Sequence, residues 1–261
     1  MLRKIAGSFF QGIRSLLSCR KNLSSKLGSR VFPVKIPLAL DEKTGWKPYP
    51  VFSGNTSRGE LLACHFSVLF PGVIAHPVHQ HPEEEILVLL SGELELFTSE
   101  DQVTLKKAAF LIMPGQMFLY PADFPHTIRS SGCEPAQYMM IKWSALKRTT
   151  GALLPFGMFD IAVPEKPARS IPEFHPHILF EGRTACLDKL QCHVTRLAPG
   201  SGYLPHEDPY DVVLLMLDGE GMTLGTRITP HDVIFYAEGE PHGMHNPGTA
   251  PARYLVCEFH W

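Results

Sequence analysis

The chain has 261 residues, of which 44% are hydrophobic and 19% are charged, and its formal net charge at pH 7 is −2. This length suffices for two compact domains of about 100 residues each, and a charge so near neutral gives no reason to expect a nucleic-acid partner. No apolar run approaches the roughly 18 to 20 residues that a transmembrane helix needs, so we expect no transmembrane segment.

The first 40 residues differ from the rest of the chain in charge. They contain eight basic residues and no acidic residue. Apolar residues also recur there at helical spacing, namely at Leu2, Ile5, Phe9, Ile13 and Leu16. A basic, acid-free, amphipathic segment is typical of a mitochondrial transit peptide, and also of a helix that packs on its own protein or touches a membrane surface. We expect a cytoplasmic protein, or a mitochondrial one if the source is eukaryotic.

Short apolar runs separated by turn residues follow this segment. The 23 prolines and 21 glycines of the chain punctuate runs that read as β-strands. In the first half these runs cover residues 61–70, 86–90, 93–97, 109–113, 116–120 and 137–143. In the second half they cover residues 192–197, 212–217, 232–236 and 252–259. The sequence therefore predicts an all-β fold.

A dense group of potential metal ligands lies in the first half. His79 and His81 point to one face of a strand because strand side chains alternate, and Glu85 shares that face if the local bend preserves parity. Its neighbour Glu84 should then point the opposite way and stay solvated. Imidazole nitrogens with a carboxylate oxygen suit iron, manganese, nickel, copper or zinc. His126, which follows a predicted turn, is the candidate for a fourth ligand.

These residues resemble the two sequence motifs of the cupin family. The first motif is matched by Gly72, His79, His81, Glu85 and Gly92, with one extra residue after Gly72. The second is matched by Gly115, Pro121 and His126, whereas Asp123 replaces an inner Gly and Ser130 replaces an Asn. Every position that the family uses to bind metal is therefore kept.

The resemblance implies a double-stranded β-helix, or jelly-roll barrel, that holds one divalent transition metal. Its ligands would be His79, His81, Glu85 and His126, with Fe(II) favoured and Mn(II), Ni(II), Cu(II) or Zn(II) as alternatives. In such families Glu85 can also leave the metal and act as a catalytic base. Phe66, Met113, Phe118 and Met140 are candidates for the pocket wall, and His76 for a group beside the metal or the substrate.

A second copy of both motifs follows roughly 120 residues later, which predicts a bicupin with two barrels in one chain. The second motif recurs at residues 237–246 with its inner Gly and its Asn present. In the first motif His206 is kept, but Asp208 stands where the second His should be and Val212 where the Glu should be.

This altered site has two interpretations. In the first, which we favour, the site has lost its metal, and His206 and Asp208 merely pair with each other. In the second, His206, Asp208 and His242 form a two-His, one-carboxylate facial triad, the composition that some oxygenases use for Fe(II).

The expected organisation has four parts. Residues 1–40 form the basic segment, residues 41–145 a cupin with an intact metal site, residues 146–182 a Pro-rich linker, and residues 183–261 a cupin with an altered site. The favoured function is a metal-dependent oxygenase acting on a small enolisable or carboxylate-bearing molecule. The alternatives are a non-oxidative metalloenzyme (decarboxylase, isomerase or lyase) and a non-catalytic bicupin that binds a small molecule or a partner protein. The expected partner is a small-molecule substrate, and a homodimer is left open.

Overall fold

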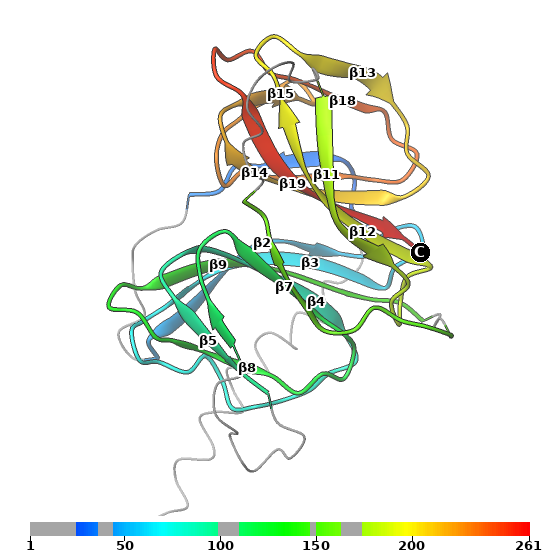
Figure 1. Ribbon diagram of the computed structural model, residues 1–261. Coiled ribbons are helices and arrows are strands. Elements are labelled where there is room, and N and C mark those ends of the chain that lie inside the picture. The colour runs from blue at the N-terminus through cyan, green and yellow to red at the C-terminus, as the bar shows by residue number, and fades with distance from the viewer. Residues whose placement is uncertain (1–24, 36–43, 99–109, 147–149, 163–173) are drawn as a thin grey trace, which may run out of the picture.

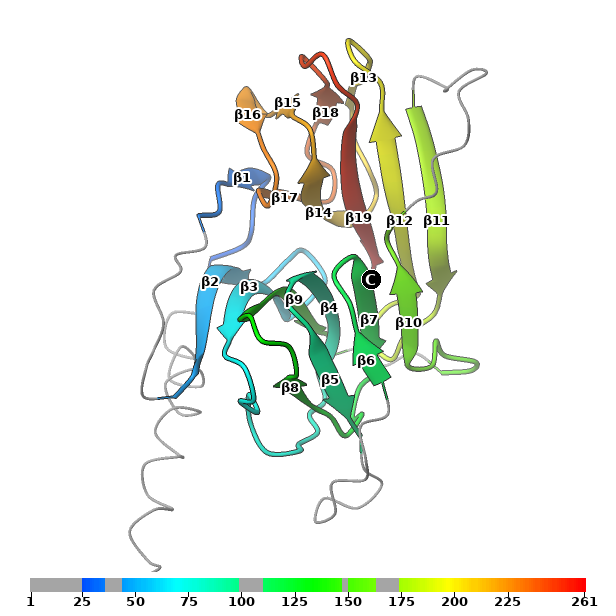
Figure 2. The same ribbon diagram turned by 60° about the vertical axis from the view of Figure 1, so that its left-hand side comes forward.

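The computed structural model describes residues 25–35, 44–98, 110–146, 150–162 and 174–261. Two β-barrels lie one above the other (Figures 1 and 2), which confirms the all-β, two-barrel prediction. The helical pattern expected between Leu2 and Leu16 lies outside the described residues. In the part of the chain that is described, no helix is long and apolar enough to cross a membrane.

The N-terminal barrel consists of a six-stranded and a three-stranded antiparallel sheet. The large sheet has the order β10-β7-β4-β9-β3-β2 and the small one the order β6-β5-β8. Its described strands are β2 (Trp46–Gly54), β3 (Leu61–Leu69), β4 (Glu84–Ser91), β5 (Leu94–Phe97), β6 (Phe110–Ile112), β7 (Gln116–Tyr120), β8 (Thr127–Ser130), β9 (Ala136–Ser144) and β10 (Gly157–Asp160).

The C-terminal barrel repeats this plan with sheets of six and four strands. Their orders are β1-β17-β14-β19-β12-β11 and β13-β18-β15-β16. The strands are β1 (Arg30–Phe32), β11 (Phe174–Gly182), β12 (Lys189–Leu197), β13 (Gly202–His206), β14 (Asp211–Asp218), β15 (Gly221–Thr223), β16 (Thr226–Ile228), β17 (Val233–Tyr236), β18 (His242–His245) and β19 (Ala252–His260).

The boundaries of the structural units differ from those expected. Strand β1 lies within the segment assigned to the basic N-terminus, yet it pairs with β17 of the C-terminal barrel. The stretch assigned to the linker contains β10, which pairs with β7, and β11, which pairs with β12. The N-terminal barrel thus gains one strand, β10, and the C-terminal barrel gains two, β1 and β11. These strands are short or Pro-containing, and β1 and β10 pair with strands that lie far away in the sequence.

Alternation along the strands divides the buried residues into three groups. In β4, Ile86 and Val88 face a core that the two large sheets share, whereas Leu87 and Leu89 face the interior of the N-terminal barrel. The C-terminal barrel has its own interior core, with Val212 and Leu214 on β14. The shared core contains residues of both barrels, so the barrels bury one continuous apolar interface.

This alternation corrects two of the expected pocket-wall residues. Phe118 and Met140 lie in the interior of the N-terminal barrel as expected. Phe66 belongs to the shared core between the barrels, and Met113 is 42% exposed. Both had been placed by residue type, but Phe66 lies on the outer face of β3 and Met113 follows the last residue of β6.

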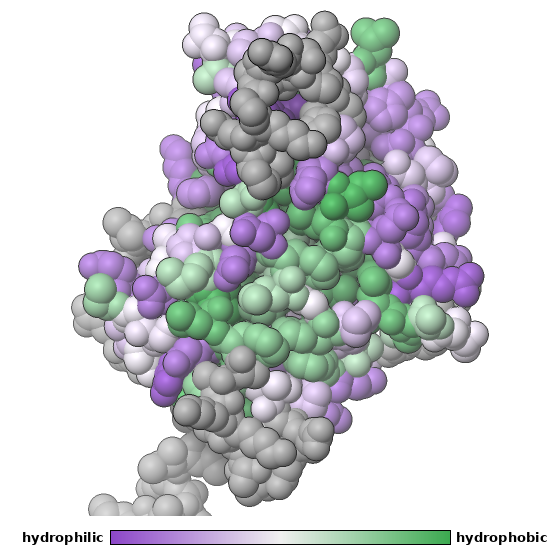
Figure 3. All heavy atoms as spheres, viewed as in Figure 1, coloured by the Kyte–Doolittle hydropathy of each residue, from purple (hydrophilic) through white to green (hydrophobic). Residues whose placement is uncertain are grey.

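Apolar residues also gather on the face of the N-terminal barrel that Figure 3 shows. Strand β6 exposes Phe110 and Leu111, and β10 exposes Met158. Most of the large apolar side chains of the described strands are nevertheless buried, as two closed cores require.

Candidate metal centre

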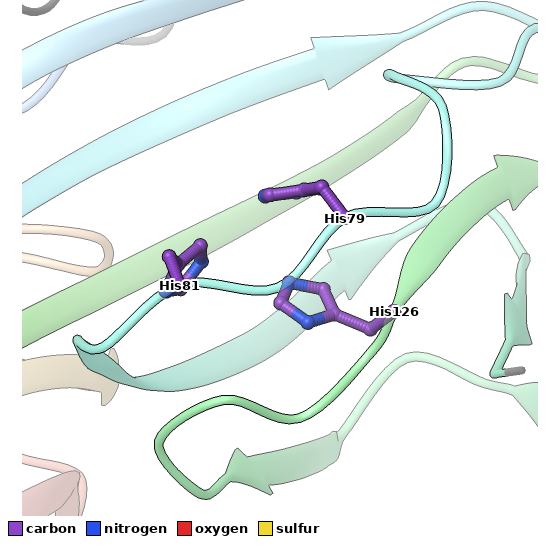
Figure 4. A group of neighbouring side chains, drawn as sticks. All are labelled: His79, His81 and His126. Carbon is purple, nitrogen blue, oxygen red and sulfur yellow. The ribbon is translucent and has the colours of Figure 1, made fainter. Parts of the chain in front are cut away.

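The first site lies at one end of the N-terminal barrel, where the loop before β4 meets the loop before β8. His79 and His81 come from the first loop and His126 from the second, and His79 pairs with His126 through backbone hydrogen bonds. The three side chains lie around one space (Figure 4). Their potential ligand atoms are all within 4.8 Å of one another, so the structure brings together the three predicted imidazoles.

Glu85, the predicted fourth ligand, is the second residue of β4 and is only 4% exposed. Its Oε2 lies 3.2 Å from Nε2 of His126, and its Oε1 lies 3.4 Å from Nε2 of His81. Glu85 therefore contacts two of the three imidazoles. That these four residues bind a metal remains a prediction.

The backbone fixes which imidazole nitrogen faces Glu85. Nδ1 of His126 lies 2.7 Å from the carbonyl oxygen of Phe124, and Nδ1 of His81 lies 3.1 Å from that of Glu83. A carbonyl oxygen can only accept, so each Nδ1 carries a proton and donates it, and Nε2 of the neutral ring presents a lone pair. A lone pair directed at a carboxylate oxygen is stable only with a proton or a cation between the two atoms.

The residues present fit a divalent transition metal. The donor set of three imidazoles and one carboxylate is of the type that such ions prefer. The buried Nδ1 of His79 has no hydrogen-bond partner among the described residues, which leaves it available to a ligand. Burial and the neighbouring His76, His126 and His81 lower the pKa of His79 to about 3, so this imidazole is neutral and able to coordinate at neutral pH.

Lys142 is a member of the site that the sequence analysis missed. It lies on β9 directly opposite Glu85, and its Nζ is 2.7 Å from Oε1 of Glu85 and 3.4 Å from Nε2 of His81. Burial disfavours the ionised form of Glu85, but the Lys142 ammonium outweighs this effect and holds the pKa of Glu85 well below its usual range. The alternation of β9 shows that Lys142 faces the interior, but its partner on β4 depends on strand register.

Two further histidines lie beside the centre. The ring of His76 makes an edge contact with that of His79, with 4.1 Å between their centroids, which is the position expected for a residue beside the metal or substrate. His65 lies on β3, and burial lowers its pKa to about 4. It was not anticipated, although its alternation with the buried Cys64 and Phe66 places it on the interior face.

Glu84 corrects a further expectation. It points away from Glu85 as predicted, but it is 1% exposed rather than solvated. Its Oε2 accepts hydrogen bonds from Nε1 of Trp143 at 3.0 Å and from Thr184 Oγ1 at 2.5 Å, and its Oε1 accepts one from the backbone N–H of Ala185 at 2.9 Å. Because the opposite side of β4 faces the second barrel, Glu84 joins the two barrels.

The turn before His126 keeps its geometry despite its altered sequence. Asp123 has a φ of 61°, and Gly239, at the corresponding position of the second barrel, has a φ of 75°. The backbone N–H of Asp123 donates to the carbonyl of His81, and that of Gly239 donates to the carbonyl of Asp208. Asp tolerates this left-handed conformation better than most residues do.

The second site has the same construction with different ligands. His206, Asp208 and His242 form a second group whose ligand atoms lie within 4.8 Å of one another. Nε2 of His242 lies 3.3 Å from Oδ2 of Asp208, and that of His206 lies 3.7 Å from it. The structure therefore brings the three predicted residues together, with Asp208 pairing with both histidines. That this group binds metal stays a prediction of the second interpretation.

Comparison with known proteins gives a family match for the part of the chain that carries the first site. Residues 65–142 match the family profile described as "Cupin domain". No curated protein sequence matches the chain. Similarity to solved structures extends much further along the chain.

Three of these structures illustrate the range of similar proteins. A mutant of Bacillus subtilis oxalate decarboxylase has a TM-score of 0.61 and 14% identity, covering 91% of this chain and 78% of the other. AerE from Microcystis aeruginosa has a TM-score of 0.59 and 13% identity, covering 90% and 98%. A salicylate 1,2-dioxygenase from Pseudaminobacter salicylatoxidans has a TM-score of 0.57 and 13% identity, covering 76% and 70%. Identities this low establish the fold and not the reaction. Residues 65–142 thus match a cupin domain, and the chain as a whole has the two-barrel fold of these structures.

Proposed function

We propose that this protein is a metal-dependent oxygenase whose N-terminal barrel acts on a small enolisable or carboxylate-bearing organic molecule. The observation that carries the proposal is a cluster of three imidazoles. Two of them contact the buried carboxylate of Glu85, and the Lys142 ammonium lies beside it. His79, His81, Glu85 and His126 would hold the ion, and Fe(II) is favoured. A redox-active ion in this place supplies Lewis acidity and the ability to react with dioxygen.

The residues of the chain itself favour an anionic substrate. Lys142 contributes a positive charge on the interior face of β9, with its side chain 29% exposed, so it can pair with a carboxylate or enolate oxygen. The same lysine holds Glu85 in its ionised form, which is the form that binds a metal ion.

Aromatic rings limit the access of water to one side of the centre. Tyr120 stacks on His126 with 4.5 Å between ring centroids, and Phe124 stacks on Phe156 at 4.8 Å. These rings fix the orientation of His126 and provide an apolar wall for the carbon skeleton of a substrate.

Oxygen consumption by the Fe(II)-loaded full-length protein tests the proposal. The substrates are salicylate, oxalate, acetylacetone and quercetin, which present carboxylate or enolisable oxygens. We expect at least one to sustain oxygen uptake, and expect His81→Ala to abolish it. His177→Ala, which changes an exposed histidine of β11, should leave it intact. Absence of uptake with every substrate would contradict the oxygenase proposal.

A non-oxidative reaction is the second candidate, and the Lys142–Glu85 pair is the observation that favours it. Decarboxylation and isomerisation end in a proton transfer to carbon, and this pair places a proton donor 2.7 Å from an acceptor. The same substrates incubated without oxygen, with release of CO₂ or isomer formation as the readout, distinguish this candidate. A protein that binds these compounds but converts none of them would be a non-catalytic bicupin.

A further inference from the structure

The C-terminal barrel contains a cavity of about 300 Å³, at the lower end of the range for small-molecule sites. It extends from His206, Asp208 and His242 into the interior between β12, β14, β17 and β19. Four tyrosines contribute to its wall. Its lining includes His193, Thr195, Asp208, Val212, Tyr254 and Glu258.

This cavity has the opposite charge pattern to the site in the N-terminal barrel. There, Glu85 on β4 lies opposite Lys142 on β9. At the corresponding pair of the C-terminal barrel, Val212 on β14 lies opposite Glu258 on β19. The lysine is thus replaced by a carboxylate, and the carboxylate by an apolar residue. Among the described residues that line the cavity there is no lysine or arginine, so an anionic ligand would find no cationic side chain there.

Polar atoms in the deeper part of the cavity lack partners. The buried Nδ1 of His193 forms no hydrogen bond with the described residues. The buried hydroxyl oxygens of Thr195 and Tyr254 lie near other hydroxyls without forming a hydrogen bond of good geometry. Each of these atoms can accept a hydrogen bond. Because buried polar groups are almost always satisfied, they indicate a ligand with polar atoms.

The negative charge of the Glu258 carboxylate is only partly offset by its neighbours. It is 8% exposed, and its near polar neighbours are Gln191, His193 and His260. Burial raises the pKa of Glu258 to about 7 despite the opposing charge of Lys189. A positively charged ligand would offset this burial and favour the ionised form.

We propose that the cavity of the C-terminal barrel binds a small organic ammonium ion, with Asp208 and Glu258 as its anionic partners. An ammonium group supplies the positive charge that the cavity lacks, and its N–H groups can donate to both carboxylates. Tyr203, Tyr210 and Tyr254 surround its apolar part and can add cation–π attraction.

A divalent metal at His206, Asp208 and His242 is the competing occupant. Such an ion would be served by β13, β18 and the loop that follows β13. It would leave unexplained the acceptors on β12 and β19, namely His193, Thr195, Tyr254 and Glu258. An organic cation accounts for both groups of residues.

Isothermal titration of the full-length, EDTA-dialysed protein tests the proposal with three probes of similar shape. These are 2-phenylethylamine, 2-phenylethanol and phenylacetate. We expect saturable binding of the amine, binding of the alcohol at least about tenfold weaker because it lacks the charge, and no detectable binding of the carboxylate. Equal affinity for all three, or preference for phenylacetate, would overturn the proposal.

Charge-removing variants locate the binding. Glu258→Gln and Asp208→Asn should each weaken amine binding by at least about tenfold, since each removes a charged acceptor. Asp218→Asn is the matched control, because this carboxylate is exposed and pairs with Arg253 on the outside of the same barrel. Amine binding that survives both cavity variants would place the ligand elsewhere and refute the assignment.

Two further measurements complete the test. Glu258→Lys places a lysine where the N-terminal barrel has Lys142, and it should shift the preference from phenylethylamine to phenylacetate. If changes at Glu258 prevent folding, the half-buried Asp208→Asn variant decides alone.

Finally, Mn(II) is added to the amine complex. Displacement of the amine by one equivalent of Mn(II), lost in His206→Ala, would show a metal site instead. The oxygen-uptake assay concerns the other barrel, so either proposal can fail without the other.

Discussion

At the scale of single residues, both sites orient their histidines by the same local device. Nδ1 of His126, His206 and His242 each lies near the carbonyl oxygen two residues earlier in the chain. This short-range bond sets the tautomer and turns Nε2 toward a carboxylate. The imidazoles are therefore prepared for a cation by the backbone itself.

His126→Ala tests the ligand assignment of the first site. Because loss even of groups that only orient a metal ligand commonly costs 10 to 100-fold in affinity, we expect bound metal to fall at least about tenfold. Elemental analysis of the protein purified without added metal measures this. His177→Ala, on exposed β11, is the control, and unchanged metal content in His126→Ala would show that the ligand set is wrong.

The sequence was sufficient to predict the histidines of the site but not their environment. The spacing of His79, His81 and His126 within recognisable motifs allowed their convergence to be expected, and the structure brings them together. Lys142 lies 57 residues after Glu85, and it meets Glu85 only through the register of β9 against β4. No local pattern encodes that register, so the charge beside the predicted ligand could not be foreseen.

At the scale of secondary-structure elements, a buried carboxylate anchors the first residue of β4 and of β14. Glu84, the first residue of β4, binds Trp143 and the turn at residues 184–186. Asp211, the first residue of β14, accepts hydrogen bonds from Nε1 of Trp261 at 2.6 Å and from the backbone N–H of Glu238 at 2.9 Å. The two strands thus begin with equivalent anchors, as expected for two copies of one unit.

Glu84→Ala should destabilise the protein by at least about 3 kcal/mol. The substitution leaves several buried donors without an acceptor, and each such donor costs about 1 to 3 kcal/mol. Urea denaturation followed by tryptophan fluorescence measures the loss, since Trp143 is one of the donors. Glu60→Ala, at an exposed position before β3, should change stability by less than about 0.5 kcal/mol. Similar values for the two variants would show that Glu84 is not an anchor.

The strands themselves differed in how well they could be predicted. Apolar runs such as those of β4 and β14 are confirmed, because alternation and turn residues mark them locally. Strands β1, β10 and β13 were not predicted, since each is short and none of their residues is buried. Their stability depends on pairing with distant strands, which leaves little trace in the local sequence.

At the scale of the whole molecule, the shared core should make the barrels unfold together. The core contains Phe52 and Trp143 of one barrel and Phe235 and Phe259 of the other. Exposing one barrel would expose the apolar face of its neighbour as well. We expect one calorimetric transition for the metal-free protein, with a calorimetric enthalpy equal to the van't Hoff enthalpy. Two separated transitions would contradict this.

Acid should weaken the metal-free protein over a defined range. Burial lowers the pKa of His65 and of His193 from 6.5 to about 4. Between these two pH values the unfolded chain binds protons that the folded chain does not, so the free energy of unfolding falls as pH falls from about 6.5 to about 4. Above this range the two histidines contribute no pH dependence.

Urea denaturation at about pH 7 and about pH 5 measures this effect. His193→Gln removes one of the two groups, so the difference in unfolding free energy between these pH values should become smaller. An unchanged difference would show that folding does not change the pKa of His193. His245→Gln, at an exposed position of β18, is the matched control and should leave the difference as it is.

The chain positions of β1 and β10 have a consequence for any attempt to produce one barrel alone, because β1 precedes the N-terminal barrel but pairs in the C-terminal one, and β10 follows β9 but pairs with β7. A fragment that ends after β9 lacks β10 and leaves β7 as an unprotected sheet edge, while a fragment that starts at β11 leaves β17 in the same state. Exposed edges with unpaired N–H and C=O groups are templates for aggregation and domain swapping. A usable N-terminal fragment must extend through Asp160, and a usable C-terminal one must be supplied with residues 30–34 as a separate or fused peptide.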